Sequence, residues 1–164
     1  MEKENGKYDE HRKISGVMKK SVKTVRPDAK VRKVVQLMSD RNISCVVITE
    51  GKKPVGIVTE RDILKKVVLS GMDIDENSVK EIMSTELITA SPESDLIPTG
   101  RYMKRKKIRR FPVTNENGNL VGLVTETDIL EGIISLVKFL DWKLVKMRIS
   151  VADYLQKLKD TKFL

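Results

Sequence analysis

Two threonine–aspartate pairs carry the clearest chemistry in this sequence. Thr59 lies three residues before Asp62, and Thr125 lies three residues before Asp128, within a segment that occurs twice in nearly the same form. A carboxylate can accept hydrogen bonds from both vicinal hydroxyls of a ribose. A threonine that opens a helix lies beside unpaired backbone N–H groups, which attract phosphate oxygens. We therefore expect each pair to bind a sugar or a phosphate, and helix capping without a ligand is the alternative.

Phosphate groups need cations, and the arginines near the two pairs come from different places in the chain. Arg61 lies inside the first pair, whereas Thr127 occupies the matching position of the second. Arg109 and Arg110 precede the central strand of the second half, where the first half has Ser44. Arginine makes planar, bidentate contacts with phosphate. The sequence therefore predicts one arginine source for each of two pockets, with unequal affinities.

The two pairs belong to a long internal repeat. Met18 recurs as Met83, and Pro27 recurs as Pro92, each 65 positions later. The unit is longer than the ~20–50 residues of solenoid and propeller repeats, so one copy can hold several strands and helices. We expect two similar halves packed about a pseudo-two-fold axis.

Each copy predicts the order strand, helix, strand, strand, helix, which makes the fold α+β. In the first copy, residues 23–25 are extended ahead of Pro27, and a helix follows with Asp28 as its expected N-cap. The β-branched run 44–49 predicts a buried strand, and 55–58 is its hairpin partner. A second helix follows, with an apolar face made by Ile63, Leu64, Val67 and Val68.

The second copy repeats this order with two differences. Pro98 and Gly100 fall in its first helix, so the start of that helix is expected to be irregular. The apolar stripe of its last helix continues past the repeat to about Arg148, and Ser150 is expected to cap a further short helix. This stretch has more apolar surface than it can hide alone, so we expect it to dock on its own module or on a second subunit.

The chain accordingly divides into four parts. Residues 1–13 are expected to form a flexible polar tail, 14–75 the first repeat, 76–133 the second repeat and 134–164 a C-terminal helical extension.

Composition excludes several classes of site. The single cysteine, Cys45, cannot form an internal disulfide, and the single histidine, His11, lies in the polar tail. A zinc site, a histidine-activated nucleophile and a haem pocket are therefore not expected, and no metal site is predicted. No apolar run reaches ~18–20 residues and the N-terminus lacks a signal-peptide pattern, so we expect a cytoplasmic protein that does not enter membranes.

The net charge of +9 includes a dense basic run at 104–110, in which six of seven residues are lysine or arginine. Such a run attracts nucleotide phosphates or nucleic acid. An aromatic content of 4% leaves few side chains on which bases of a single strand could stack. Nucleic-acid binding through 104–110 is therefore the alternative to nucleotide binding.

As a whole, the repeat resembles the CBS domain family, named after cystathionine β-synthase, over about residues 14–133. The resemblance rests on two Gly-x-Val-Thr-x-x-Asp segments in register, on the recurring methionines and prolines, and on the Arg-Arg-Phe-Pro-Val run that ends at Val113. It implies one pseudo-symmetric module whose strands pair at the centre, with two clefts between the copies. In many members these clefts bind AMP, ADP or ATP, whereas S-adenosyl compounds and divalent cations bind some others.

The resemblance also implies which side chains line the clefts. In the family, the adenine ring lies between apolar side chains and backbone edges, and a basic pair ahead of the second strand contacts phosphates. Plain core packing is the alternative role for the adenine positions. Those positions are Thr24, Val25, Cys45, Val46 and Val47 in the first copy, and Thr89, Ala90, Phe111 and Pro112 in the second.

These features predict a non-catalytic sensor that binds an adenine nucleotide and relays the bound state to a protein partner. Tandem CBS modules commonly pair into a flat disc of four repeats, so a homodimer is expected, with residues 134–164 at or beside the interface. An enzyme is not expected, because the repeats contain no histidine and no nucleophile with an evident base. The identity of the nucleotide and of the regulated partner stays open.

Overall fold

A three-stranded sheet forms the centre of the first copy in the computed structural model, which describes the backbone of residues 12–160 and the side chains of 12–146. The middle strand, β2, is buried over residues 45–49 and pairs in parallel with β1 and antiparallel with β3. The chain follows the predicted order of elements. These are β1 (Thr24–Val25), α2 (Val31–Arg41), β2 (Cys45–Glu50), β3 (Lys53–Thr59) and α3 (Glu60–Asp62), which continues as the π-helical segment η2 (Ile63–Val68).

The second copy repeats this layout around a two-stranded hairpin. Its first strand is reduced to one parallel bridge between Ala90 and Val113. The predicted α+β fold with two repeats and a C-terminal helix is thus confirmed, and each copy opens with a 3-10 turn. The elements are η1 (Ile14–Gly16) ahead of the first copy, and η3 (Val79–Glu81), α4 (Leu96–Lys106), β4 (Arg110–Thr114), β5 (Leu120–Thr125) and α5 (Glu126–Asp160) in the second.

The segment that opens each copy crosses over and pairs with the hairpin of the other copy. Lys19 exchanges two backbone hydrogen bonds with Leu123 on β5, at N···O distances of 2.9 and 3.0 Å. Ser84 does the same with Ile57 on β3, at 2.9 and 3.1 Å. Ile14, although it opens the first copy, is buried in the core of the second. Neither half therefore has a complete core without the other.

The repeated glycine of the two Gly-x-Val-Thr segments makes room for this crossing. A Cβ atom on Gly56 would lie 2.5 Å from the sulfur of Met83, and one on Gly122 would lie 2.7 Å from the sulfur of Met18. Both methionines belong to the crossing segments. The repeated glycine and the repeated methionine are therefore two halves of one packing contact.

The start of α2 differs from the prediction that Asp28 caps it. The N-cap residue is Lys30, whose side chain makes no capping bond, and Asp28 pairs with Arg26 instead. The first helical N–H, on Val31, donates to the carbonyl of Asn77 at 3.1 Å. A carbonyl from the loop between the copies therefore satisfies the helix start, so the helix needs no side-chain cap.

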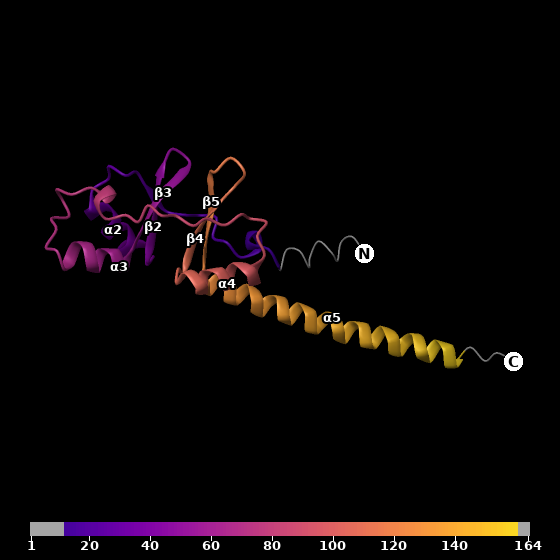
Figure 1. Cartoon of the computed structure of the whole chain (residues 1–164). Helices are drawn as coiled ribbons and strands as arrows, with labels where there is room; N and C mark the ends of the chain where they lie inside the picture. Colours follow the sequence, from indigo (N-terminus) through magenta and orange to yellow (C-terminus); the bar gives the residue numbers. More distant parts are fainter. Residues whose placement is uncertain (1–11, 161–164) are drawn as a thin grey trace.

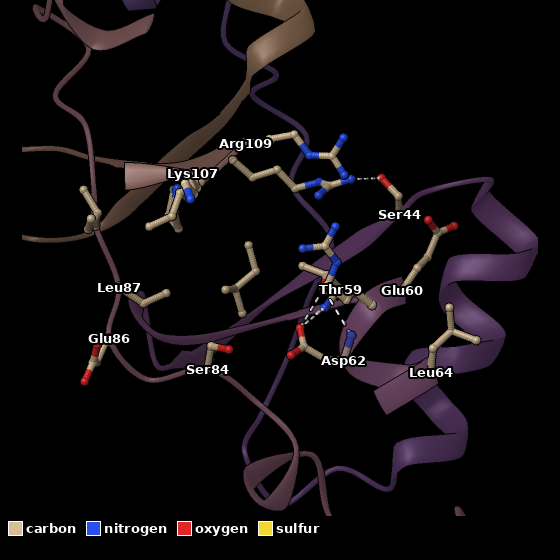
Figure 2. A pocket seen from close by; sticks show the side chains of 16 residues that line it. Ser44, Thr59, Glu60, Asp62, Leu64, Ser84, Glu86, Leu87, Lys107 and Arg109 are labelled. Atoms are coloured by element: carbon tan, nitrogen blue, oxygen red, sulfur yellow. Dashed lines mark hydrogen bonds between the residues drawn. The ribbon is translucent and has the colours of Figure 1, made fainter. Parts of the chain in front are cut away.

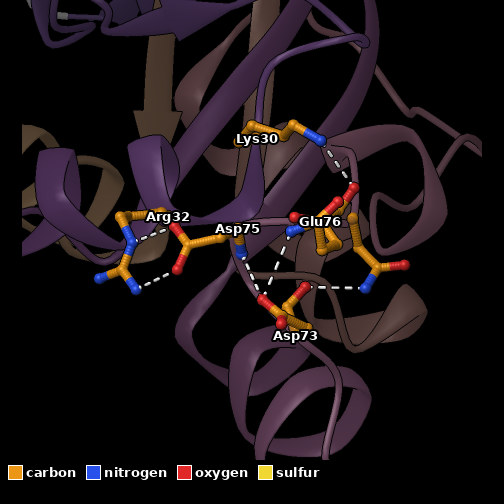
Figure 3. A network of polar contacts seen from close by, with 6 residues as sticks. Lys30, Arg32, Asp73, Asp75 and Glu76 are labelled. Carbon is orange, nitrogen blue, oxygen red and sulfur yellow. Dashed lines mark hydrogen bonds and ion pairs between the residues drawn. The ribbon is translucent and has the colours of Figure 1, made fainter.

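The loop between the copies is tied to α2 by polar contacts, which Figure 3 shows. Arg32 donates from two nitrogens to the two carboxylate oxygens of Asp75, and Lys30 Nζ donates to the Glu76 carbonyl at 2.7 Å. Asp73 Oδ1 accepts from the backbone N–H of Asp75 at 2.8 Å. The hydrogen bond from Arg32 lowers the pKa of the Asp75 carboxyl. Because the pair is exposed, we expect it to position the loop and to add little to the stability of the fold.

α4 is a regular helix from its first turn, unlike the predicted irregular start. Pro98 lies in that first turn, where a helix needs no N–H donor. Gly100 lies against α5, and a Cβ atom on it would be 3.1 Å from Cγ2 of Ile129. The proline occupies a tolerated position and the glycine allows close helix packing, so neither one disrupts the helix.

α5 is a single helix of 35 residues that projects away from the two copies (Figure 1). At 1.5 Å per residue it spans about 50 Å. The predicted break near Arg148 and the new cap at Ser150 are wrong. Beyond Gly132 the sequence of this helix holds no glycine or proline, so the backbone has no reason to stop.

None of the helices in the described part of the chain has the length and apolar character that crossing a membrane requires. Residues 1–11 of the expected tail, with His11, lie outside the described residues.

Candidate functional site

A cleft of about 610 Å³ lies between the two copies, and Figure 2 shows it from close by. The first copy lines it with the end of β3 and the start of α3. The crossing segment lines it with Ser84 and residues 86–88, and the second copy adds 107–110 and Pro112. The cleft is therefore built jointly by both repeats and by the chain that passes between them.

Thr59 and Asp62 form a reciprocal cap at the start of α3. The hydroxyl and the backbone N–H of Thr59 donate to Oδ2 of Asp62 at 2.7 and 2.9 Å, and the Asp62 N–H donates back to the hydroxyl at 3.3 Å. This confirms the capping geometry. The other oxygen, Oδ1, lies 3.3 Å from Nζ of Lys66. A carboxylate oxygen has two lone pairs, so Oδ1 retains capacity for a ligand hydroxyl.

Four basic residues line the same cleft. Nη2 of Arg110 reaches the first copy and donates to the Ser44 hydroxyl at 2.6 Å. In Figure 2, Lys107 and Arg109 lie on the far side of the cleft from Asp62. A cationic side that faces a carboxylate suits a ligand with phosphates at one end and hydroxyls at the other. The basic residues are Arg61, Lys107, Arg109 and Arg110.

This distribution of arginines differs from the prediction of one source for each pocket. Arg61 comes from the first copy, Arg109 and Arg110 come from the second, and all three line one cleft. The crossing of the chain explains why these arginines share one cleft. Because residues 84–88 run from β3 of the first half towards β4 of the second, the start of β4 faces the start of α3.

Sequence reasoning missed a further group of cleft residues. Residues 84–88 carry no periodic pattern and no motif, so only the tertiary structure brings them to the site. Lys107 is different, because it belongs to the basic run 104–110, and that run could have indicated a phosphate-binding role for it. The missed residues are Ile57, Glu60, Leu64, Ser84, Glu86, Leu87, Ile88, Lys107 and Ile108.

The second copy forms the same cap at the start of α5. Asp128 Oδ2 accepts from the backbone N–H and the hydroxyl of Thr125 at 2.8 and 2.7 Å, and the Asp128 N–H donates back at 3.2 Å. Asp128 is only 6% exposed, and its Oδ1 lies 3.4 Å from Nζ of Lys19. Thr127 is exposed on α5. Thr125, Thr127 and Asp128 do not line the Asp62 cleft, so the two Thr–Asp pairs lie at separate places.

The residues predicted to contact adenine are spread over several places, and their contact with a ligand stays a prediction. Pro112 lines the Asp62 cleft. Thr89, Ala90 and Phe111 line a different cleft, of about 660 Å³, beside α4. Thr24 lines a small cleft of about 220 Å³ near the two hairpin turns. The remaining positions are buried in the core: Val25, Cys45, Val46 and Val47.

Other reactive groups near the cleft are few. Burial raises the pKa of the Cys45 thiol, although Arg110 acts in the opposite direction. The thiol is therefore held in its neutral form. Across residues 12–146, no three His, Cys, Asp or Glu side chains gather closely enough to hold a metal ion.

Comparison with protein families gives a match to the CBS domain at residues 14–69 and again at 79–135. The chain belongs to the CBS domain family. It carries the domain twice, as a tandem pair, and the two matched ranges correspond to the two halves described above.

Several curated proteins are similar to this chain over 113 to 119 residues. An uncharacterized protein of Methanopyrus kandleri is 35% identical over 119 residues, which are 72% of this chain and 61% of that protein. The CBS domain-containing protein YhcV of Bacillus subtilis is 32% identical over 116 residues, or 71% and 81% of the two chains. Inosine-5'-monophosphate dehydrogenase of Korarchaeum cryptofilum is 37% identical over 113 residues, which are 67% of this chain and 22% of that enzyme. The chain thus spans less than two thirds of the first relative and about a fifth of the enzyme.

Solved structures share the fold of the pair. An uncharacterized conserved protein from Pyrococcus horikoshii has a TM-score of 0.67 at 29% identity, covering 75% of this chain and 92% of that one. CBSX2 in complex with AMP has a TM-score of 0.66 at 18% identity, covering 76% and 98%. The CBS domain pair of MJ0100, in complex with 5'-methylthioadenosine and S-adenosyl-L-methionine, has a TM-score of 0.65 at 24% identity, covering 73% and 93%.

Proposed function

We propose that this CBS pair is a non-catalytic regulatory module that binds an adenine nucleotide in the Asp62 cleft and relays the bound state to a protein partner. The observation that carries the proposal is the opposition of charges across one cleft. Asp62 and Thr59 supply acceptors and donors for ribose oxygens on one side. Lys107, Arg109 and Arg110 supply phosphate contacts from the other copy, and Arg61 adds a fourth cation from the first copy.

The size and apolar lining of the cleft support the same ligand class. Its volume of about 610 Å³ falls in the usual range of about 300–1,000 Å³ for small-molecule sites. Ile57, Leu87, Ile88 and Pro112 give it apolar walls against which a purine ring can pack. Two proteins of the same fold were solved with AMP or with S-adenosyl-L-methionine, which is consistent with an adenosine compound in such a module.

The charge of the cleft favours nucleotides with several phosphates. Arg61, Lys107, Arg109 and Arg110 outnumber the acidic residues Glu60, Asp62 and Glu86 among its lining residues. We expect ATP and ADP to bind at least as tightly as AMP. We expect S-adenosyl-L-methionine to bind more weakly, because its sulfonium is positive.

Thermal unfolding of the ligand-free protein tests this proposal. Millimolar AMP, ADP and ATP should raise the Tm, because a ligand that binds only the folded state stabilises it by RT ln(1 + [L]/Kd). GTP and CTP at the same concentration are the matched controls and should raise it less. If none of the adenine nucleotides shifts the Tm, the proposal is wrong.

Nucleic-acid binding through the run 104–110 stays the alternative. Lys107, Arg109 and Arg110 line the cleft, whereas 104–106 are exposed on the last turn of α4. This division supports a nucleotide site, because half of the run faces a cleft of nucleotide size. An oligonucleotide that binds with steep salt dependence and is not displaced by ATP would favour the alternative.

The proposed relay runs through an exposed apolar surface beside the cleft. Leu64 lines the cleft and is also 60% exposed, next to Val68 on η2. The matching positions of the second copy, Leu130 and Ile134 on α5, are exposed too. Exposed apolar surface of this kind marks an interface. We propose that a second copy of the chain packs against it. We also propose that the protein acts in the cytoplasm. Ligand binding would bias this interface through its contact with Leu64.

A further inference from the structure

The carboxylate of the second copy is already paired inside the chain. In both caps, Oδ2 of the aspartate accepts from the threonine and Oδ1 is left over. Oδ1 of Asp128 lies 3.4 Å from Nζ of Lys19. The Asp128 side chain is 7% exposed, against 16% for Asp62. The oxygen that would accept a ligand hydroxyl in the second copy therefore already meets an ammonium group.

The crossing of the chain fixes the position of the Lys19 backbone. Lys19 and Ser84 hold matching positions, since each exchanges two backbone hydrogen bonds with the hairpin of the other copy, at Leu123 and Ile57. Ser84 lines the Asp62 cleft. A lysine therefore stands beside the second Thr–Asp pair at the place where the Asp62 cleft has the small hydroxyl of Ser84. The Lys19 side chain is 68% exposed and covers Asp128 from the solvent side, with Nζ 3.4 Å from Oδ1.

Asp62 also has a lysine neighbour, but that lysine comes from another direction. Lys66 lies one turn further along the same helix and also donates to the Ile82 carbonyl at 2.6 Å. It is not among the residues that line the cleft. The matching position of α5 is Gly132, where a Cβ atom would lie 2.6 Å from Cγ1 of Val17. The second copy has no room for a lysine there, and its carboxylate is paired through the cleft side instead.

The positions that match the cations of the Asp62 cleft hold no cations. The two copies can be aligned on a shared structural position. Asn42 and Lys107 each follow the last residue of a helix and adopt the left-handed conformation, with φ of 49° and 56°. Counted from this pair, Arg109 corresponds to Ser44 and Arg110 to Cys45. Thr127 stands where the first copy has Arg61. Lys19 is thus the nearest cation to the second carboxylate, and Asp128 already engages it.

We propose that Lys19 closes the second cleft by occupying the ligand position on Asp128, so that the chain binds a single nucleotide, in the Asp62 cleft. This inference rests on the proposed function and adds to it the stoichiometry and the residue that sets it. Removal of the Lys19 side chain opens the second cleft to an adenine nucleoside or nucleotide.

Native mass spectrometry and calorimetry of ligand-free protein with AMP, and then with adenosine, test the inference. The variant Lys19→Ser carries the residue of the matching position, and Lys20→Ser removes the same charge from the neighbouring position. Wild type and Lys20→Ser should bind one AMP per chain. Lys19→Ser should bind a second ligand, at least about tenfold more weakly for AMP because the second cleft lacks arginines. Adding Asp128→Ala to Lys19→Ser should abolish that second site.

The outcomes separate the two proposals. A wild-type chain that binds two AMP molecules overturns the inference and leaves the proposed function standing. A Lys19→Ser chain that is folded and still binds one ligand also overturns the inference. A wild-type chain that binds none, while Lys19→Ser binds one, supports the closure by Lys19 and overturns the proposed site at Asp62. If neither chain binds an adenine ligand, both proposals fail.

Discussion

At the scale of single residues, Asp62 and Asp128 perform the same structural task and differ in what their second oxygen meets. Each uses Oδ2 to cap a helix with the preceding threonine. Oδ1 of Asp62 meets a lysine of its own helix beside an open cleft, whereas Oδ1 of the buried Asp128 meets the exposed Lys19 from the opening segment of the first copy. We therefore expect the repeated motif to cap a helix in both copies and to bind a ligand only at Asp62.

Comparing Asp62→Ala with Asp128→Ala separates the two roles. Both variants lose a cap, so each should be less stable by about 1 kcal/mol in urea unfolding. Only Asp62→Ala should lose affinity for AMP, by about ten- to a hundredfold, because a hydrogen bond to a charged acceptor is worth about 1.5–3 kcal/mol. Isothermal titration calorimetry gives the affinity. If Asp62→Ala is destabilised without any change in affinity, Asp62 is only a cap.

The pKa of Cys45 leads to a second residue-scale prediction. Burial raises this pKa, so the folded chain keeps a proton that the unfolded chain releases in alkaline solution. The resulting stability is fully present below the ordinary thiol pKa and is lost as the pH rises through the higher pKa of the folded state. We expect iodoacetamide to label the folded protein far more slowly than the urea-unfolded protein at pH 8. Equal rates would show that Cys45 is accessible.

At the scale of elements, α4 and α5 pack closely because glycines stand at their contact. A Cβ atom on Gly132 would lie 2.8 Å from Cδ1 of Leu96 and 2.6 Å from Val17, whereas one on Gly100 would lie 3.1 Å from a single methyl of Ile129. The Thr125–Asp128 cap lies at the start of α5, so this packing also positions the second cap.

Alanine substitution at the two glycines should have opposite outcomes. Gly132→Ala should destabilise the fold by about 1–3 kcal/mol through overpacking, although alanine is favoured over glycine in a helix by about 1 kcal/mol. Gly100→Ala should be neutral or slightly stabilising, because one methyl group can yield by a few tenths of an ångström. Urea unfolding of both variants measures the change in the free energy of unfolding. A Gly132→Ala protein as stable as wild type would mean that Val17 and Leu96 repack freely.

At the scale of the whole molecule, α5 extends far beyond the module that it closes (Figure 1). Leu136 is buried, Phe139 is half-buried, and the other large apolar side chains between Leu136 and residue 146 are exposed. The helix projects outward, so it does not fold back over its own repeats. The exposed residues of this stretch are Val137, Leu140, Trp142, Leu144 and Val145.

A chain that ends at Lys138 tests the role of this extension in assembly. It keeps the buried Leu136, so it should stay folded and bind nucleotide. We expect the full chain to be a homodimer in light scattering. The shortened chain should form a weaker dimer, which dissociates at a higher protein concentration, because the apolar face of α5 is lost. Leu144→Glu in the full chain is the control that keeps the helix. A full-length monomer would contradict the prediction, and a shortened dimer of equal affinity would place the interface on η2 and the start of α5.

Local patterns determined most of the architecture. The repeat, the order of elements and both Thr–Asp caps could be predicted because each depends on residues that are neighbours in the chain. The cap joins residues three positions apart, and a strand or helix is specified by its own periodicity. Even the continuity of α5 was contained in the sequence, since no glycine or proline interrupts it after Gly132.

Contacts between distant segments could not be predicted in this way. No local pattern shows that Arg61 and Arg110 share one cleft, that the Asn77 carbonyl replaces Asp28 at the start of α2, or that Lys19 reaches Asp128. All of these follow from two crossings of the chain, which exchange the opening segments of the copies. The sequence therefore determined which groups are available for binding, and the tertiary structure decided which of them meet, because the crossing is set by the packing of both halves together.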